Sequence, residues 1–231
     1  MTHTQGISIP KFNVSQEDLK ILACVTMLID HIGAIFFPTV AIYRLIGRIA
    51  FPLYAFLLAE GVHYTRSPLK YGLRLLFVAI LTELPYDLLF RGEFTWAKNS
   101  AMITLLLGFG AGIAMKHCRG WWKLLVCLPF VFLARYTHSS YGMEGVLMIV
   151  LFLLCREIPR RRLVQIVLMV LLSLRMAGFP GRISLQIYGL LAMIPITLYS
   201  GEKRSHNKAM QWAFTLFYPV HIVILLLIRG I

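Results

Sequence analysis

The sequence is a series of long apolar segments separated by short polar loops, and this pattern limits the possible folds more than any other feature. A helix needs about 20 apolar residues to cross the hydrocarbon core of a membrane, or about 17 when its flanking residues snorkel. Strands are not indicated, because no ten-residue alternation typical of membrane barrels occurs. The pattern predicts nine helical segments: 19–37, 40–62, 70–90, 102–116, 121–135, 141–155, 162–175, 184–199 and 209–228.

We therefore expect an all-helical, polytopic transmembrane bundle. Several middle segments are short, so the expected number of spans is eight to ten. The domain prediction is a polar cytoplasmic arm at 1–18 followed by a single transmembrane domain at 19–231. Because residues 1–18 are polar, no cleavable signal peptide is expected and the first span stays in the membrane.

Composition supports this fold class. Hydrophobic residues make up 58% of the chain and charged residues 14%, against about 45–50% and about 25% in soluble domains. So little charge excludes soluble globular, disordered, collagen-like and disulfide-scaffold proteins, and a soluble nucleic-acid binder despite the net charge of +13. The four cysteines lack CxxC or metal-type spacing and are expected to be small buried apolar residues, with no metal bound.

The positive charge fits a membrane topology. When the loops are assigned alternately to the two sides, 15 of the 23 Lys and Arg residues fall on one side and six on the other. Basic residues collect in cytoplasmic loops. The N-terminus is therefore predicted inside and the C-terminus outside, in a multi-pass protein of the bacterial inner membrane.

Ionisable residues inside the predicted spans are the candidates for function. Each costs about 2.5–3.5 kcal/mol at bilayer depth on insertion scales, so each needs a partner or a role. By helical rise they all fall between the bilayer midplane and the outer surface. They can neutralise one another, or form an active site with a base, an orienting acid and cationic clamps. They are Asp30, His31, Arg44, Arg48, Glu83, Asp87 and His221.

Structural explanations compete with catalytic ones for these residues. Arg44 or Arg48 can pair with Glu83 or Asp87 and simply hold two spans together. The adjacent pair Asp30 and His31 is harder to explain in this way, because neighbouring helical residues point about 100° apart and both need polar neighbours.

His221 and Glu60 also have structural explanations. His221 follows Tyr218 and Pro219, so it can bond a carbonyl that the proline leaves free. Glu60 ends the second span and is expected to form an interfacial ion pair with Arg66.

Four segments resemble the TraX family of integral-membrane proteins: LKILACVTMLIDHIGAIFFP, YRLIGRIAFPLYAFLLAEG, YGLRLLFVAILTELPYDLLF and FYPVHIVIL. The resemblance runs from Leu19 to the C-terminus, with a less distinctive middle at 115–183. It implies N-acetyltransferase chemistry, since the family's namesake acetylates the amino terminus of conjugative pilin. The family is also similar to membrane acyltransferases that use cytosolic acyl-CoA to modify acceptors across the bilayer.

The residues fit this chemistry independently. Acyl transfer to an amine needs a base and donors that stabilise the tetrahedral oxyanion. We expect His31 to be the base, with Asp30 or a carboxylate of the third span fixing its tautomer, because burial disfavours a charged imidazolium. His221 is the second candidate, as base or oxyanion donor.

The remaining charged residues are assigned to binding. Arg44 and Arg48 are candidates for clamping a phosphate or holding the carboxylates. Glu83 and Asp87 are candidates for binding the cationic amine of the acceptor, while Glu60 and Tyr218 complete the charge network. Acetyl-CoA is the expected acyl donor, without a Gly-rich phosphate cradle. Its phosphates are expected to contact basic residues at the cytosolic face: Arg66, Lys70, Arg74 and Lys116.

The expected acceptor is a pilin-like protein or peptide amine, and the expected surroundings are the lipid bilayer. Two other functions remain open: a proton-coupled transporter, since relays use intramembrane acidic residues and histidines, and a non-catalytic factor of pilus or secretion assembly. A homodimer is possible. Gly108 and Gly112 form a GxxxG pair, for which packing within the bundle is favoured over dimerisation.

Overall fold

A computed structural model describes residues 13–95, 99–156, 161–176, 178, 184–202 and 208–230. The described residues are helical apart from loops and two isolated bridges. The helices are α1 (Gln16–Phe36), α2 (Ala41–Gly47), α3 (Ala50–Tyr64), α4 (Pro68–Arg91), α5 (Ala101–Lys116), α6 (Trp122–Tyr136), α7 (Gly142–Cys155), α8 (Arg161–Met176), the 3-10 helix η1 (Leu185–Ala192), α9 (Met193–Thr197) and α10 (Lys208–Arg229).

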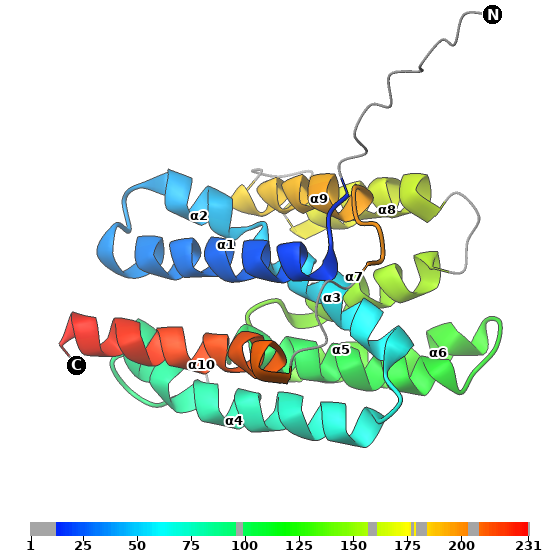
Figure 1. Cartoon of the computed structure of the whole chain (residues 1–231), viewed down its shortest axis with the longest axis horizontal. Coiled ribbons are helices and arrows are strands. Elements are labelled where there is room, and N and C mark those ends of the chain that lie inside the picture. Colours follow the sequence, from blue (N-terminus) through cyan, green and yellow to red (C-terminus); the bar gives the residue numbers. More distant parts are fainter. Residues whose placement is uncertain are drawn as a thin grey trace, which may run out of the picture.

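Each predicted apolar segment corresponds to one helix or to two consecutive ones, which confirms the all-helical prediction for the described residues. Figure 1 shows the longer helices side by side, with the chain reversing direction from one to the next. Among the described residues, three helical segments are long and apolar enough to cross a membrane: α1, the stretch Ala41–Tyr64 that comprises α2 and α3, and Ala209–Arg229. The predicted arm at 1–18 lies largely outside the described residues.

The second predicted span is broken, which the sequence pattern did not anticipate. Helix α2 ends at Gly47 and α3 begins at Ala50, with Arg48 and Ile49 in a turn between them. Pro52 explains the break, because it lacks the N–H that would continue the helix but is tolerated in a first turn, where N–H groups have no helical partner. The break places Arg48 at a helix junction.

Helix α3 forms the centre of the bundle and contacts α1, α5, α7 and η1. Apolar side chains on all its faces are buried, including Phe51, Leu53 and Val62. Two glycines of α5 let α7 approach closely, since a Cβ at Gly108 would lie 2.2 Å from Ile149 and one at Gly112 would lie 2.9 Å from Leu153. The GxxxG pair therefore serves packing within the bundle, as expected.

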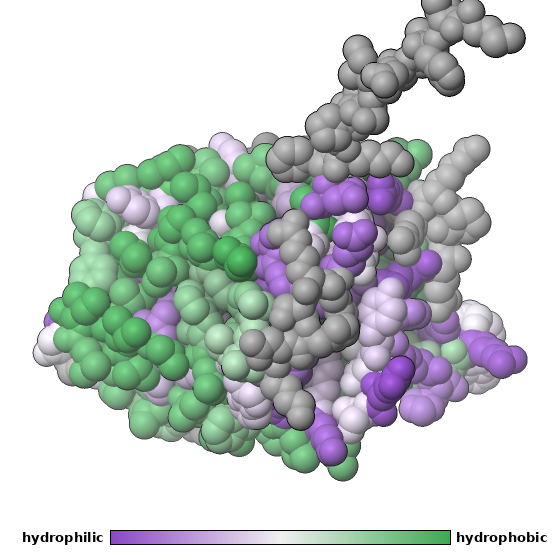
Figure 2. All heavy atoms as spheres, viewed as in Figure 1, coloured by the Kyte–Doolittle hydropathy of each residue, from purple (hydrophilic) through white to green (hydrophobic). Residues whose placement is uncertain are grey.

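The outer surface is largely apolar. Large apolar side chains of α4 and α10 are exposed, among them Phe77 at 54%, Ile80 at 69% and Leu227 at 70%. Figure 2 shows hydrophobic residues over most of this face, with hydrophilic residues gathered at the end where α1 begins. An exposed apolar surface of this extent is typical of a protein that contacts a membrane or another protein there.

Helix α10 lies beside α4 and also contacts α1 (Figure 1). This arrangement brings the last predicted span against the first, although they are far apart in the sequence. It sets the geometry of the polar site described below.

Candidate active site

A cavity of about 820 Å³ extends through the interior of the bundle. At one end it is lined by residues from the beginnings of α1 and α4, including Lys20 and Lys70. Farther along it is lined by His31 and Arg48, and by Tyr141 just before α7. The cavity thus connects the hydrophilic end of the molecule with the polar residues predicted inside the spans.

Asp30 pairs with both arginines of the second predicted span. Its Oδ2 lies 2.8 Å from Nη1 of Arg44, and its Oδ1 accepts a hydrogen bond of 2.9 Å from Nη2 of Arg48. The sequence suggested that these arginines pair with Glu83 or Asp87. In the structure their carboxylate partner is Asp30 instead. Asp30 is therefore held by the arginines and is not bonded to the imidazole of His31.

Gly47 makes this ion pair possible. A Cβ atom at residue 47 would lie 2.0 Å from Oδ1 of Asp30, well inside contact distance. Only a glycine lets α2 approach α1 closely enough for the carboxylate to sit against its backbone.

His31 and His221 form a hydrogen-bonded pair. Nδ1 of His31 lies 2.8 Å from Nε2 of His221, and Nδ1 of His221 lies 2.7 Å from the carbonyl oxygen of Phe217. A carbonyl only accepts, so Nδ1 of His221 carries the proton that it donates. In a neutral pair, Nε2 of His221 then accepts from Nδ1–H of His31. This leaves Nε2 of His31 without a proton and able to act as a base.

The two histidines differ in their access to the cavity. His31 is in the cavity wall with 8% of its surface exposed, whereas the 4% exposed His221 is not among the lining residues. The prediction that Asp30 or a carboxylate of α4 fixes the tautomer of His31 is thus wrong, because an imidazole does so. His221 donates a hydrogen bond to a backbone carbonyl, as its structural role predicted, and it also orients His31.

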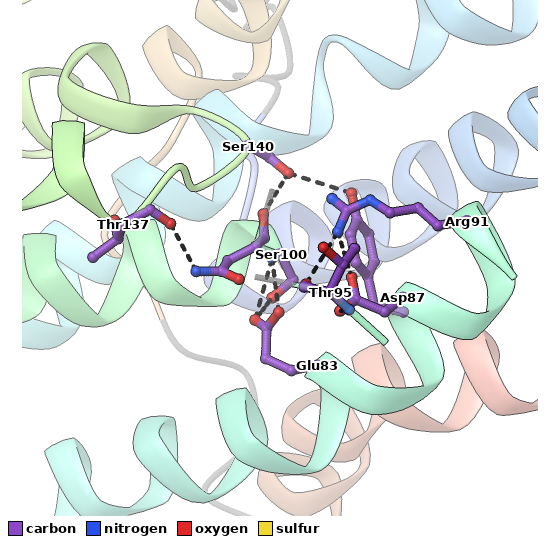
Figure 3. Close-up of polar contacts among 9 residues, drawn as sticks. Glu83, Asp87, Arg91, Thr95, Ser100, Thr137 and Ser140 are labelled. Carbon is purple, nitrogen blue, oxygen red and sulfur yellow. Dashed lines mark hydrogen bonds and ion pairs between the residues drawn. The ribbon is translucent and has the colours of Figure 1, made fainter. Parts of the chain in front are cut away.

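Glu83 and Asp87 lie together near the end of α4 and bind backbone and side chains there (Figure 3). The carboxylate of Glu83 accepts from the backbone N of Ser100 at 3.1 Å and from its Oγ at 2.5 Å. Asp87 lies 2.7 Å from Nη1 of Arg91 and accepts from the backbone N of Thr95 at 3.0 Å. These carboxylates join α4 to the segment before α5, and neither lines the cavity.

Glu60 has a different partner from the one predicted. It forms an ion pair with Arg156, and Tyr199 donates to its Oε2 at 3.4 Å. Arg66 is not its partner in the described structure. The interaction ties the end of α3 to the end of α7, because Arg156 directly follows α7.

Two of the four predicted phosphate contacts line the cavity. Lys70 and Arg74 do so, whereas Arg66 and Lys116 do not, and Lys116 donates to the carbonyl of His63 at 3.0 Å. Lys20 lines the same end from α1, although sequence analysis did not select it. We call Lys20, Lys70 and Arg74 the basic mouth.

Two tyrosines of the cavity were not predicted as site residues. Tyr86 and Tyr141 line it beside Tyr218, which was predicted. Tyr218 contacts His31 edge-on, with ring centroids 6.0 Å apart, and Tyr141 stacks on Phe51. No sequence signal marked Tyr86, which lies within α4, or Tyr141, which directly precedes α7. In the described residues no three His, Cys, Asp or Glu side chains form a metal-binding group.

Comparison with known proteins gives one family. The sequence model described as "TraX protein" matches residues 15–229. The chain is 25% identical over 229 residues to the "Probable fimbrial assembly protein FimC, serogroup H1" of Dichelobacter nodosus, covering 90% of this chain and 92% of that protein. It is 32% identical over 93 residues to the "Uncharacterized protein RP591" of Rickettsia prowazekii (strain Madrid E), covering 40% and 34%. No solved structure matches the chain.

Proposed function

The chain belongs to the TraX family, and on that basis we propose that it is an integral-membrane acyltransferase that transfers an acetyl group from cytosolic acetyl-CoA to an acceptor amine. The observation that carries the proposal is His31, whose Nε2 is left unprotonated in the wall of a cavity that begins at a basic mouth. The favoured acceptor is the amino terminus of a pilin-like protein or peptide. A relative named as a probable fimbrial assembly protein supports this choice.

The proposed setting is the bacterial inner membrane, crossed about nine times. Exposed apolar side chains on α4 and α10 support contact with lipid. The excess of basic residues in alternate loops supports a cytoplasmic N-terminus. In that orientation the basic mouth faces the cytosol, where acetyl-CoA is available.

The cavity suits an acyl-CoA donor. Phosphates would bind Lys20, Lys70 and Arg74, and the pantetheine arm would extend along α1 toward His31. His31 comes eleven positions after Lys20, which is about 16 Å of helical rise. Apolar side chains such as Leu57 and Val78 line the cavity and suit an uncharged arm.

The proposed reaction follows from the residues around His31. Nε2 of His31 takes a proton from the amine as its nitrogen bonds to the thioester carbonyl carbon. The oxyanion forms beside the guanidinium of Arg48, which favours developing negative charge. Collapse breaks the carbon–sulfur bond, and His31 returns the proton to the leaving CoA thiolate.

A second candidate is a non-catalytic role in pilus assembly. The printed name of the Dichelobacter relative favours it, because that name describes assembly and no reaction. In that case the ion pairs of Asp30 would only hold helices together.

The test uses purified protein in nanodiscs. Acetyl-CoA binding is measured by calorimetry, and release of free CoA is followed for the wild type, His31→Ala and the exposed-histidine control His63→Ala. We expect saturable binding in all three proteins, and slow CoA release that only His31→Ala abolishes. No binding at millimolar acetyl-CoA by a folded wild type would refute the proposal and leave the assembly and transport roles.

A further inference from the structure

The charges around Asp30 do not balance. One carboxylate faces two guanidinium groups, those of Arg44 and Arg48. The carboxylates expected nearby are bound elsewhere, Glu83 by Ser100 and Asp87 by Arg91. The described cluster therefore carries a net positive charge inside the bundle, where an uncompensated charge is costly.

Both arginines retain N–H groups that the protein does not use. Arg44 bonds Asp30 through Nη1 alone, with its side chain 32% exposed. Arg48 uses Nη2 toward Asp30 and Nε toward the carbonyl of Arg44. Nε and Nη2 of Arg44 and Nη1 of Arg48 have no protein partner in the described structure. Both side chains line the cavity.

We propose that Arg44 and Arg48 form an anion subsite that binds a carboxylate or phosphate group carried by the acceptor. A guanidinium presents its N–H groups in a fork that matches the oxygens of either group. Arg44 makes the contact with the bound anion, and Arg48 remains beside the reacting carbonyl. The bound anion adds a second negative charge, which together with that of Asp30 balances the two guanidinium groups.

The subsite is separate from the basic mouth. Asp30 and Lys20 are ten residues apart on α1, or about 15 Å along the helix. A single phosphate group cannot contact the basic mouth and Arg44 at once. The phosphates of a donor bound at the mouth therefore leave the Arg44 subsite vacant. The anion subsite rests on the geometry, whereas its assignment to the acceptor rests on the proposed acyl transfer.

The positive charge of the two arginines also determines the protonation state in which an amine can bind. A cationic ammonium is repelled by the two guanidinium groups, while a neutral amine is not. The cavity therefore selects an acceptor with an uncharged nucleophile and an anionic group nearby. This replaces the expectation that Glu83 and Asp87 hold a cationic amine, since neither lines the cavity.

Trifluoroacetate tests the subsite, because its fluorine signal reports binding in nanodiscs without acetyl-CoA. Its neutral counterpart trifluoroacetamide is the matched control. The background is a triple variant in which Lys20→Gln, Lys70→Gln and Arg74→Gln remove the basic mouth. We expect saturable binding of the carboxylate and none of the amide.

Two further substitutions in that background should act in opposite directions. Arg44→Gln should abolish trifluoroacetate binding, whereas Asp30→Asn should tighten it about tenfold, roughly the effect of 1.4 kcal/mol, because both guanidinium groups are released. Arg44→Lys keeps the charge but not the fork and should bind more weakly than the background. Binding that survives Arg44→Gln, or that is absent from the background, overturns the proposal.

Comparison with CoA release by the wild type separates this inference from the proposed function. If the wild type releases no CoA while the triple variant still binds trifluoroacetate, that result counts against acyl transfer but not against the subsite. Competition by acetate and by methyl phosphate then identifies the group that the acceptor carries. Stronger competition by methyl phosphate indicates a phosphate-bearing acceptor, and stronger competition by acetate indicates a carboxylate such as an acidic side chain.

Discussion

His31 places its Nδ1 2.8 Å from Nε2 of His221, so one imidazole sets the proton position of the other. The rings are nearly parallel, with an interplanar angle of 8°. The usual orienting partner of a catalytic histidine is a carboxylate, which also stabilises the imidazolium that forms. Here the adjacent carboxylate, Asp30, is held by two arginines. The proposed base is thus oriented by a neutral group, next to a cationic cluster.

His221→Ala should weaken acetyl transfer while leaving acetyl-CoA binding unchanged. Losing one orienting hydrogen bond of about 1–1.5 kcal/mol lowers the rate about tenfold. Nitrogen NMR of histidine-labelled protein should show an unprotonated Nε2 on His31 in the wild type and a mixture of tautomers in the variant. His221→Gln, which keeps an acceptor near Nδ1 of His31, should recover part of both signals. A protonated Nε2 in the wild type at neutral pH would contradict the assignment.

Reversing charge at the basic mouth should weaken donor binding. Lys70→Glu combined with Arg74→Glu should raise the Kd of acetyl-CoA at least about tenfold, since a hydrogen bond to a charged group is worth about 1.5–3 kcal/mol. The effect should shrink at high salt, which screens exposed charges. The matched control combines Arg66→Glu with Lys116→Glu, which makes the same charge change outside the cavity lining. Equal losses in the two double variants would show that only overall charge matters.

Glu60→Gln should destabilise the protein, because it leaves the guanidinium of Arg156 beside a neutral amide. Breaking a buried ion pair costs about 3–5 kcal/mol, and Glu60 is 3% exposed. Thermal unfolding in detergent measures the loss. Adding Arg156→Gln should restore part of the stability, because the guanidinium that lost its carboxylate partner is then removed. If the double variant is as unstable as the sum of both single variants, the pair is not coupled.

Gly47→Ala should disturb both stability and the ion pairs of Asp30. The new Cβ would lie 2.0 Å from Oδ1 of Asp30, so α1 and α2 must separate, at a cost of about 1–3 kcal/mol. Gly72→Ala is the control, since its Cβ would lie 3.1 Å from one ring atom of Phe109. The unfolding temperature should fall more for Gly47→Ala. Equal unfolding temperatures would mean that the helices need not pack this closely.

The positions of the helices could be predicted closely. The segment predicted at 70–90 is the helix Pro68–Arg91, and the one predicted at 102–116 is Ala101–Lys116. Apolar length and polar loops suffice for this, because a span is defined by a run of apolar residues. The break before α3 was not predicted from apolar length. Predicting it would have required placing Pro52 in the first turn of a new helix rather than in the interior of one long helix.

The residues of the site could be named, but their partners could not. Lys20 was passed over because a lysine at the start of a span is the usual pattern of a cytoplasmic loop. Glu60 was assigned to the nearest basic residue in the sequence, Arg66. The structure instead joins it to Arg156, from a helix that lies beside α3 in space.

By itself the sequence determined where the helices run and which buried charges must be compensated, because both follow from the cost of placing polar groups in an apolar medium. The tertiary structure decided which of these groups meet. Neighbouring residues on a helix point about 100° apart, so a small rotation about the axis leaves the apolar pattern intact but changes every partner. Only the packing of α10 against α1 placed His221 beside His31, 190 positions away in the chain.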